Sequence, residues 1–360
     1  MLWKLLSRMD QSRFANVVVS MTLPGQLGSR IKRHGIPVFS LGMSSGIPSL
    51  FSLIYLIRLL RKQKPHVLQT WLYHADLIGL MAGKLSKVPA IVWNIRCADL
   101  ERKDHPFHLW LTLKVLARTS ALPTAVVVNS MAGRLANERL GFRPKRWQLI
   151  PNGFELDVFR PSQEARSLIH KELGLNKDTP LVGLVARFDL MKDHRTFLIA
   201  AQHLHKARPD VHFVLAGKNV DSQNAILMKQ ISDLGLEKCV HLLGERIDIP
   251  FVTAALDVAS CSSYSEGFPN VIGEAMACCV PCVATDVGDC AKIIGDTGVL
   301  VPPRNPAAMA KGWATLLSMN EEDRQKLGMK ARDRIASLFN IDIIIRQYET
   351  FYVEISDHPA

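Results

Sequence analysis

Two glutamates eight residues apart, Glu266 and Glu274, flank a predicted loop-to-helix transition in the segment SEGFPNVIGEAMA. If the helix begins near Asn270, the free backbone N–H groups of its first turn and the positive end of its dipole stabilise an anion ahead of it. Gly267 gives the preceding loop conformational freedom, and Pro269 fixes φ near the helix start. Carboxylates also accept hydrogen bonds from vicinal hydroxyls. The pattern therefore indicates a site for a ligand that carries both hydroxyls and phosphates.

Two cations follow an earlier predicted strand. Arg187 ends the apolar run LVGLVAR, and Lys192 lies five residues further on, in the turn FDLMKDH. Both side chains should project from the carboxyl edge of a sheet, which is where open α/β folds bind ligands. Two fixed cations there could hold a diphosphate without a metal ion. Since no His, Asp or Cys cluster with metal-ligand spacing stands nearby, we expect no metal site.

Short apolar runs alternate with helix-like segments along the whole chain. In the first half the predicted strands are residues 14–21, 66–71, 90–95, 125–129 and 147–152. In the second half they are residues 181–187, 211–217, 240–244, 258–263 and 281–287. Strands that alternate with amphipathic helices are typical of an α/β fold whose parallel sheets carry helices on both faces.

The chain is too long for one ordinary domain. A length of 360 residues at 40.1 kDa favours two hydrophobic cores. The alternation pauses in the polar stretch 151–165, where we place the linker. We therefore expect an N-terminal domain over residues 1–160 and a C-terminal domain over 161–338. Residues 339–360 carry apolar residues at helical spacing.

Composition is that of a well-packed soluble protein, with 48% apolar and 21% charged residues. The longest apolar run, residues 47–60, is too short to cross a bilayer and contains Arg58. We see no signal peptide. The seven cysteines are an odd number without disulfide-rich spacing, which favours a reducing compartment and hence the cytoplasm.

The net charge of +11 comes entirely from the front of the chain. Residues 1–165 contain 23 Lys and Arg against 9 Asp and Glu, whereas residues 166–360 contain 21 against 24. Such a basic block attracts either nucleic acid or an anionic membrane face, or it is an ordinary solubilising surface. No recognition-helix or aromatic stacking motif supports nucleic acid, so we expect no nucleic-acid partner.

Several blocks of the sequence together resemble the retaining glycosyltransferases of the glycogen-synthase-like family four, which have the GT-B fold. The blocks keep the family's order over most of residues 129–303. Beyond the two glutamates eight residues apart, they are IPNGFELDVFRP, VARFDLMKDHRTFLIAA, LAG at residues 215–217, LLGERIDIPFVTAALDVASCSS and GDTGVLVPP. The resemblance implies two Rossmann-like domains that face an inter-domain cleft, with residues 339–360 crossing back to the N-terminal domain. A helix that packs only on the C-terminal domain is the alternative.

The resemblance also implies roles for individual residues. Glu274 would bind the ribose hydroxyls of a nucleotide-sugar, and Glu266 would contact the donor sugar near its reacting face. Arg187 and Lys192 would neutralise the diphosphate. The backbone of the loop would cup the sugar hydroxyls and a phosphate oxygen, through Gly267, Phe268, Pro269 and Asn270.

The N-terminal half departs from the family pattern. Many relatives place a donor-contacting histidine after the strand that corresponds to residues 90–95, whereas this chain has Arg96 there. His74 is a candidate substitute, although a single histidine is more often structural. Arg96 either belongs to the site or forms an ordinary ion pair with Asp99. The family also opens with a strand and a glycine-rich loop, and this sequence starts in the helix that should follow them, so we expect the natural protein to begin upstream.

A third departure lies near the second glutamate. Cys279 stands where the family often has glycine, and with Cys282 it spells C-x-x-C. We interpret both as packing residues rather than as a zinc or redox site, because no second pair accompanies them.

The sequence thus predicts a metal-independent retaining glycosyltransferase without a cofactor, which moves a hexose or related sugar from a UDP- or GDP-linked donor. The expected acceptor is a glycan or a lipid-linked molecule in cell-surface polysaccharide or lipopolysaccharide synthesis. The basic front half favours a peripheral position on the inner face of the membrane. The alternatives are a nucleotide-sugar epimerase, a phosphorylase, or a non-catalytic protein that binds sugar nucleotides.

Overall fold

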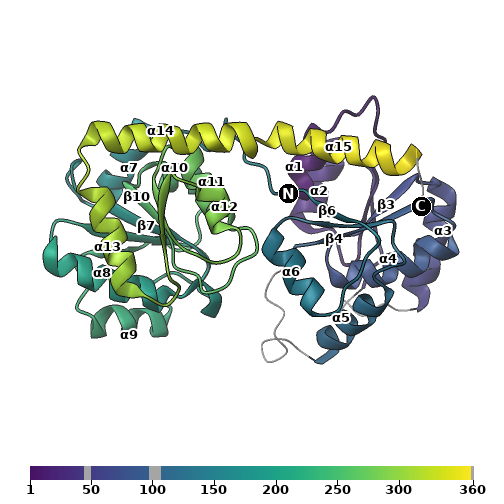
Figure 1. Ribbon diagram of the computed structural model, residues 1–360, viewed down its shortest axis with the longest axis horizontal. Coiled ribbons are helices and arrows are strands. Elements are labelled where there is room, and N and C mark those ends of the chain that lie inside the picture. Colours follow the sequence, from purple (N-terminus) through teal and green to yellow (C-terminus); the bar gives the residue numbers. More distant parts are fainter. Residues whose placement is uncertain (44–49, 97–106, 358–360) are drawn as a thin grey trace. The chain divides into compact units, whose positions relative to one another are not determined.

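The computed structural model describes residues 1–43, 50–96 and 107–357, and it divides into two compact units (Figure 1). Unit 1 is Met1–Gly153 together with Ile341–Ala360, and unit 2 is Phe154–Asn340. The chain therefore passes between the units twice. Each unit consists of parallel strands that alternate with helices. The predicted α/β fold with parallel sheets in two domains is confirmed.

Unit 1 contains two separate parallel sheets, β1–β2 and β3–β4–β5–β6. Its strands are β1 (Val18–Ser20), β2 (Val38–Ser40), β3 (Val67–Gln69), β4 (Ala90–Ile95), β5 (Ala125–Val128) and β6 (Trp147–Leu149). Its helices are α1 (Leu2–Arg8), α2 (Gly25–Arg33), α3 (Leu50–Gln63), α4 (Tyr73–Leu85), α5 (Phe107–Thr119), α6 (Met131–Arg139) and α15 (Ile341–Asp357). The strands β4 and β5 are fully buried, as expected for the centre of a parallel sheet.

The last helix of the chain packs into the core of unit 1. Tyr348 and Phe351 of α15 are buried against residues of β4 and β5. The amide of Asn94 donates to the Tyr348 hydroxyl at 3.2 Å, and the Tyr352 hydroxyl donates to Gln69 at 2.7 Å. These side chains satisfy polar atoms that burial would otherwise leave unpaired. Unit 1 therefore depends on residues from both ends of the chain.

Unit 2 has one six-stranded parallel sheet in the order β12–β11–β10–β7–β8–β9. Its strands are β7 (Leu181–Val185), β8 (His212–Ala216), β9 (Val240–Leu242), β10 (Val258–Cys261), β11 (Cys282–Thr285) and β12 (Gly298–Val301). Its helices are α7 (Gln163–Glu172), η2 (Leu190–Lys192), α8 (His194–Ala207), α9 (Ala225–Asp233), α10 (Ile249–Ala254), α11 (Asn270–Ala277), α12 (Cys290–Ile294), α13 (Pro306–Leu317) and α14 (Glu321–Leu338).

Helices cover both faces of this sheet because successive strand residues point to opposite sides. One face packs against α8, α9 and α13, and the other packs against α7, α10, α11, α12 and α14 (Figure 1). In β7, for example, Leu181 lies in the second of these cores and Val182 in the first. Side-chain caps set helix starts: Ser162 accepts from the Ala165 N–H, and Asn320 from the Asp323 N–H.

Residues 50–60 of the apolar run lie in a helix that is buried on one side and exposed on the other. This helix is α3, which begins at Leu50, and residues 47–49 lie outside the described structure. Throughout the described parts of the chain, no helix combines the length and the hydrophobicity needed to cross a bilayer.

Candidate functional site

The predicted donor-binding loops of unit 2 both lie where the strand order reverses. From β7 the chain proceeds to β8 on one side, and β10 later pairs with β7 on its other side. Such a switch point opens a crevice at the carboxyl ends of the two strands, where doubly wound sheets bind ligands. The loop after β7 carries Arg187 and Lys192, and the loop after β10 carries Glu266. The topology therefore brings the two predicted loops to one edge of the sheet.

Hydrogen bonds join these two loops directly. The Tyr264 N–H donates to the carbonyl of Met191 at 3.0 Å. The Ser262 hydroxyl donates to the carbonyl of Lys192 at 2.7 Å. Since both contacts involve backbone carbonyls of η2, they fix the turn that carries the lysine against the loop that carries Glu266.

An ion pair between Lys192 and Glu266 completes this connection. The Ser263 hydroxyl donates to the same carboxylate oxygen, Glu266 Oε1, at 2.7 Å. The two charged side chains are only 21% and 11% exposed. Removal from water strengthens the attraction between them, and it makes either charge costly to leave alone. A fixed cation and a fixed carboxylate thus stand side by side at the switch point.

Arg187 lies in the same loop but is held differently. Its guanidinium pairs with Asp189 at 3.0 Å and is 56% exposed. Burial opposes ionisation of Asp189, yet the Met191 N–H and Arg187 together lower the pKa of that carboxyl. The arginine is therefore positioned at the rim of the loop with its charge partly balanced, whereas Lys192 is the more enclosed of the two cations.

The loop that precedes α11 has one buried anchor. The Phe268 ring stacks on Phe154 with 6.1 Å between centroids, and it meets Phe339 edge-on at 5.8 Å. The Phe268 ring is therefore occupied by packing, and only the backbone of this residue is left to contact a ligand. Pro269 is also buried, and Asn270 is exposed at the first position of the helix.

Glu274 lies one turn inside α11 and is half-buried. It lines a small hollow with Val185, at the end of β7, and Ser260 of β10. This places Glu274 beside the same pair of strands whose loops carry Arg187, Lys192 and Glu266. That all four side chains bind one ligand stays a prediction.

A glycine from a third loop supports the Glu266 loop. Gly288 has φ +59°, and a Cβ atom there would lie 2.5 Å from the carbonyl oxygen of Glu266. The next residue, Asp289, donates its N–H to the carbonyl of Gly267 at 3.0 Å. Only glycine allows both the backbone angle and this close approach. The loop after β11 thus packs directly against the backbone of Glu266 and Gly267.

The two candidate residues of unit 1 also follow neighbouring strands. His74 is half-buried in the first turn of α4, after β3, and Arg96 follows β4. The Arg96 guanidinium bonds the side-chain oxygen of Asn152 and lies over the Trp71 ring at 5.2 Å from its centroid. Asp99, the expected ion-pair partner, lies outside the described residues. Trp71 and Asn152 therefore orient Arg96.

The C-x-x-C pair is built into the core of unit 2. Cys282 is fully buried in β11, and burial raises the pKa of its thiol. Burial likewise raises the pKa of the half-buried Cys279. Thiols that stay protonated are poor nucleophiles and poor metal ligands. Among the residues that the structure describes, no three His, Cys, Asp or Glu side chains group as a metal site requires.

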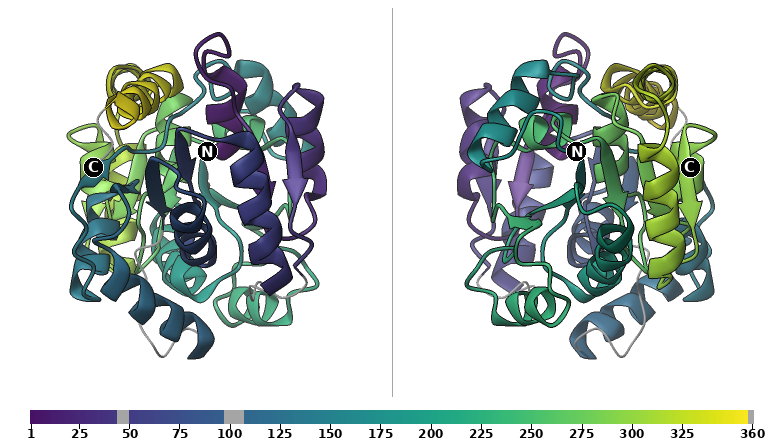
Figure 2. Two further views of the ribbon diagram at one scale, coloured as in Figure 1. Left: turned by 90° about the vertical axis from the view of Figure 1, so that its right-hand side faces the viewer. Right: turned by 90° about the vertical axis from the view of Figure 1, so that its left-hand side faces the viewer.

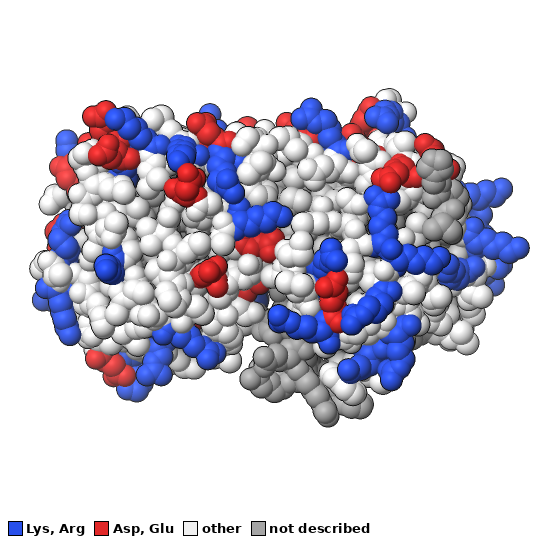
Figure 3. Space-filling model, viewed as in Figure 1, with Lys and Arg blue, Asp and Glu red and all other residues white. Residues whose placement is uncertain are grey.

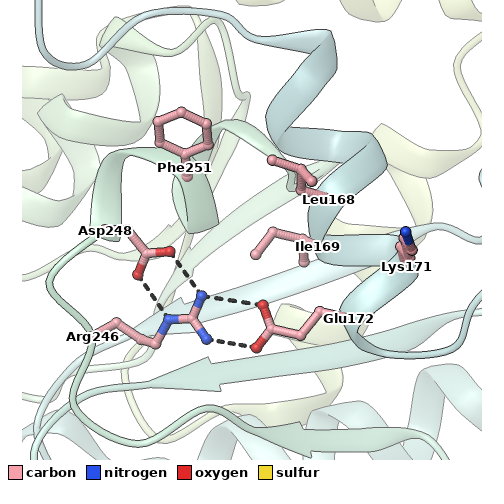
Figure 4. Close-up of a pocket in the computed structure, with 7 residues that line it drawn as sticks. All are labelled: Leu168, Ile169, Lys171, Glu172, Arg246, Asp248 and Phe251. Carbon is pink, nitrogen blue, oxygen red and sulfur yellow. Dashed lines mark hydrogen bonds and ion pairs between the residues drawn. The ribbon is translucent and has the colours of Figure 1, made fainter.

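A separate surface hollow of about 460 Å³ lies between α7 and α10 (Figure 4). Arg246 sits in it and forms paired bonds with Glu172, at 2.6 and 3.1 Å, and with Asp248, at 2.8 and 2.7 Å. Two carboxylates thus already satisfy this guanidinium. None of the predicted site residues lines this hollow.

Sequence reasoning missed the residues that position the site. Asp189 and Ser263 hold Arg187 and Glu266, and Arg304 lies over the Tyr264 ring at 4.5 Å. Ser262 and Ser263 end the predicted strand 258–263, four and three residues before Glu266, so their place in the motif was a usable signal. Arg304 lies about forty residues from its aromatic partner along the chain, and only the folded sheet brings the two together.

Two family models match the chain in consecutive parts. One described as "Glycosyltransferase Family 4" matches residues 1–158, and one described as "Glycosyl transferases group 1" matches residues 165–334. Together they span nearly the whole sequence. The second match contains every predicted donor-site residue of unit 2.

Curated relatives and solved structures agree with these matches. An Escherichia coli UDP-Gal:alpha-D-GlcNAc-diphosphoundecaprenol alpha-1,3-galactosyltransferase is 28% identical over 74% of this chain and 69% of its own length. The putative glycosyltransferase EpsF of Bacillus subtilis is 26% identical over 72% and 70%. The match to the N-acetyl-alpha-D-glucosaminyl L-malate synthase of Bacillus anthracis, 28% identical, spans 52% of this chain and only 49% of that protein. Among solved structures, HepE of Anabaena in complex with UDP and glucose superposes on this chain with a TM-score of 0.84. The match covers 98% of this chain and 95% of HepE at 22% sequence identity, and it therefore shows the fold.

Proposed function

The chain belongs to the glycosyltransferases of the glycogen-synthase-like family four and has their GT-B fold, and on this basis we propose a sugar-transfer function. The proposed reaction moves a hexose or related sugar from a nucleotide-sugar to a glycan or lipid-linked acceptor, with retention of configuration. The observation that carries the proposal is the contact of Lys192 with Glu266 at the switch point of unit 2. A cation for a diphosphate and a carboxylate for sugar hydroxyls are the two groups that such a donor requires.

The donor in this proposal lies along the carboxyl edge of β7 and β10. Lys192 and Arg187 neutralise its diphosphate, Glu274 accepts bonds from the ribose hydroxyls, and Glu266 contacts the sugar. The backbone of residues 267–270 completes the cup around the sugar and a phosphate oxygen. UDP is the first donor base to test, because HepE was solved with UDP and the E. coli relative's name specifies UDP-Gal. GDP-linked donors remain the second class.

The chemistry follows from where charge develops. As the bond from the anomeric carbon to the diphosphate breaks, positive charge grows on the sugar and negative charge on the leaving group. Lys192 and Arg187 stabilise the negative charge on the leaving diphosphate, and the N-terminus of α11 contributes the partial positive charge of its dipole. Glu266, already held by Lys192 and Ser263, faces the positive charge without having to reorganise. Because fixed cations supply the stabilisation, the proposed reaction needs no metal ion.

Unit 1 supplies the acceptor side in this proposal. His74 and Arg96 are its candidate site residues, and Trp71 and Asn152 hold Arg96 in place. The name of the E. coli relative specifies a lipid-linked diphosphate acceptor, which supports a lipid-linked glycan here too. The basic residues 1–165 favour an acceptor at an anionic membrane face. The proposed setting is cell-surface polysaccharide or lipopolysaccharide synthesis, with the enzyme peripheral on the cytoplasmic side.

A donor screen tests the proposal. Purified protein is mixed with a panel of UDP- and GDP-sugars, and thermal stability and release of free UDP or GDP are measured, with and without EDTA. We expect one donor to raise the melting temperature by mass action and to be hydrolysed slowly. The first-formed anomer of the released sugar, read by NMR, should match the donor.

A matched pair of variants makes the screen specific. Glu274→Gln should abolish stabilisation by the donor, whereas Glu245→Gln, at an exposed position after β9, should leave it unchanged. Failure of every nucleotide-sugar to bind would contradict the proposed function. Release of the opposite anomer would contradict retention, and loss of activity in EDTA would contradict metal independence.

A further inference from the structure

Helix α3 of unit 1 exposes an apolar stripe to solvent. Phe51 is 85% exposed, and Ile54 and Tyr55 are 38% and 43% exposed. Their spacing continues through Arg58 and Lys62, which are also exposed, so all five side chains lie along one side of the helix. The opposite side, with Leu56 and Leu60, is buried in the core. The outer stripe is thus apolar over its first two turns and cationic over its last two.

The end of α4 extends this stripe sideways. The two helices pack against each other (Figure 2), and the Arg61 guanidinium donates to the carbonyl of Leu85 at 3.1 Å. Met81 and Leu85 are 48% and 55% exposed, and Lys84 is exposed between them. We call this set the α3–α4 surface: Phe51, Ile54, Tyr55, Arg58, Arg61, Lys62, Met81, Lys84, Leu85 and Lys87.

Acidic residues are almost absent from this part of the sequence. Residues 11–98 contain eleven Lys or Arg and a single acid, Asp76. Asp76 is fully buried, so it places no carboxylate on the surface. Among the described residues, none of the five cations of the α3–α4 surface forms an ion pair. Figure 3 shows Lys and Arg side chains gathering around α3 and α4 on the face in view.

We infer that the α3–α4 surface docks unit 1 on an anionic lipid bilayer. Its apolar side chains would enter the interface between headgroups and acyl chains, while its cations would remain at the anionic headgroups. The charge complementarity selects this occupant. A nucleic acid would use the cations but would leave Phe51, Ile54, Met81 and Leu85 in water, and a neutral apolar partner would leave the cations unpaired. The inference rests on the proposed membrane setting and names the surface that would provide it, and none of these residues belongs to the proposed donor site.

Vesicle sedimentation of the full chain tests the inference. Vesicles of phosphatidylcholine with phosphatidylglycerol are compared with vesicles of phosphatidylcholine alone at increasing salt. We expect binding only to the anionic vesicles, with an affinity that falls steeply as salt screens the cations. The double variant Phe51→Ser with Ile54→Ser should weaken binding about tenfold, because less apolar area is buried. Arg58→Gln with Lys62→Gln should weaken it about thirtyfold, since each cation near an anionic surface contributes about 1 kcal/mol.

Matched controls lie on unit 2. Ile226→Ser on α9, where Ile226 is 63% exposed, removes an exposed apolar side chain elsewhere. Lys206→Gln with Lys311→Gln removes two exposed cations from α8 and α13. Both controls should bind vesicles as the wild type does. Equal binding to neutral vesicles, wild-type binding by the α3 variants, or preferential binding to RNA that displaces the vesicles would each overturn the inference.

The donor site gives an independent readout. In the absence of vesicles, all of these variants should release UDP from the donor at the wild-type rate. A chain that binds vesicles but never binds a nucleotide-sugar would contradict the proposed function and leave the docking surface standing. A chain that hydrolyses a donor but does not bind anionic vesicles would contradict the docking surface and the proposed membrane setting, and would leave the proposed donor chemistry standing.

Discussion

The two units differ in how their candidate residues are held. In unit 2, backbone and side-chain bonds link the loops after β7 and β10, so Lys192 and Glu266 are fixed against each other. In unit 1, His74 and Arg96 follow neighbouring strands, and Arg96 rests on an aromatic ring and an asparagine. Unit 2 has one continuous sheet, whereas the described strands of unit 1 form two. The basic surplus of the chain lies in unit 1, together with an apolar surface helix.

This difference suits the two units to different proposed roles, catalysis in unit 2 and attachment at a surface in unit 1. A transition state with developing charge requires groups that are already in place, and we propose that the joined loops of unit 2 provide them. Recognition of an acceptor at a surface instead requires a broad electrostatic field and exposed side chains, and we propose this role for unit 1. Variants in unit 2 that lower donor turnover should therefore leave vesicle binding unchanged, and variants in unit 1 that weaken vesicle binding should leave donor turnover unchanged.

The largest expected effect comes from Lys192→Met in unit 2. The change removes the cation that we propose for the leaving diphosphate, and it leaves the largely buried Glu266 carboxylate without its cationic partner. We expect the rate of donor turnover to fall about a hundred- to a thousandfold, as for loss of an oxyanion-hole donor. The assay is release of UDP, and Lys311→Met on α13 is the control. A decrease in donor turnover of less than threefold would contradict the proposal that these loops carry out the reaction.

Gly288→Ala should have the next largest effect. A Cβ atom 2.5 Å from the Glu266 carbonyl forces the donor loop to move, and we expect about a tenfold loss of donor turnover. Gly235→Ala is a close control, because Gly235 also has a positive φ, +66°, but its Cβ would meet nothing within 4 Å. Equal losses in both variants would show that backbone strain, rather than displacement of the Glu266 loop, is responsible.

Asp76→Asn tests unit 1 through pH. The raised pKa means that the folded protein keeps the Asp76 proton at pH values where the unfolded chain has lost it. Stability therefore declines as pH rises from the unfolded pKa, about 4, through the folded pKa. The asparagine variant lacks this decline and should gain stability over the wild type as pH increases. Urea unfolding followed by tryptophan fluorescence reports this, because five of the six tryptophans lie in unit 1.

The smallest effect is expected from Cys279→Gly. Cys279 directly follows the C-cap of α11 with φ +61°, a conformation that glycine adopts at lower cost. We expect the free energy of unfolding to rise by about 0.5 kcal/mol without a change in donor turnover. A stability gain accompanied by lost activity would mean that the cysteine also contributes to the site.

The local part of the candidate donor site could be predicted from the sequence. Lys192 and Glu266 sit in short motifs directly after apolar strands, and parallel strands deliver such motifs to one edge. The burial of the Phe268 ring could not be predicted, because its partners Phe154 and Phe339 come from distant parts of the chain. The ion pair between Asp189 and Arg187 could not be predicted either, because it depends on the geometry of a single turn. In unit 1, nothing in the pattern of strands 14–21 and 66–71 indicates that they would lie in different sheets.

A crystal structure of the protein with UDP tests the central assignment most directly. We predict diphosphate oxygens within hydrogen-bonding distance of Lys192 Nζ and the Arg187 guanidinium, with the ribose hydroxyls at the carboxylate of Glu274. UDP bound in the hollow around Arg246, or with its ribose away from Glu274, would contradict the account.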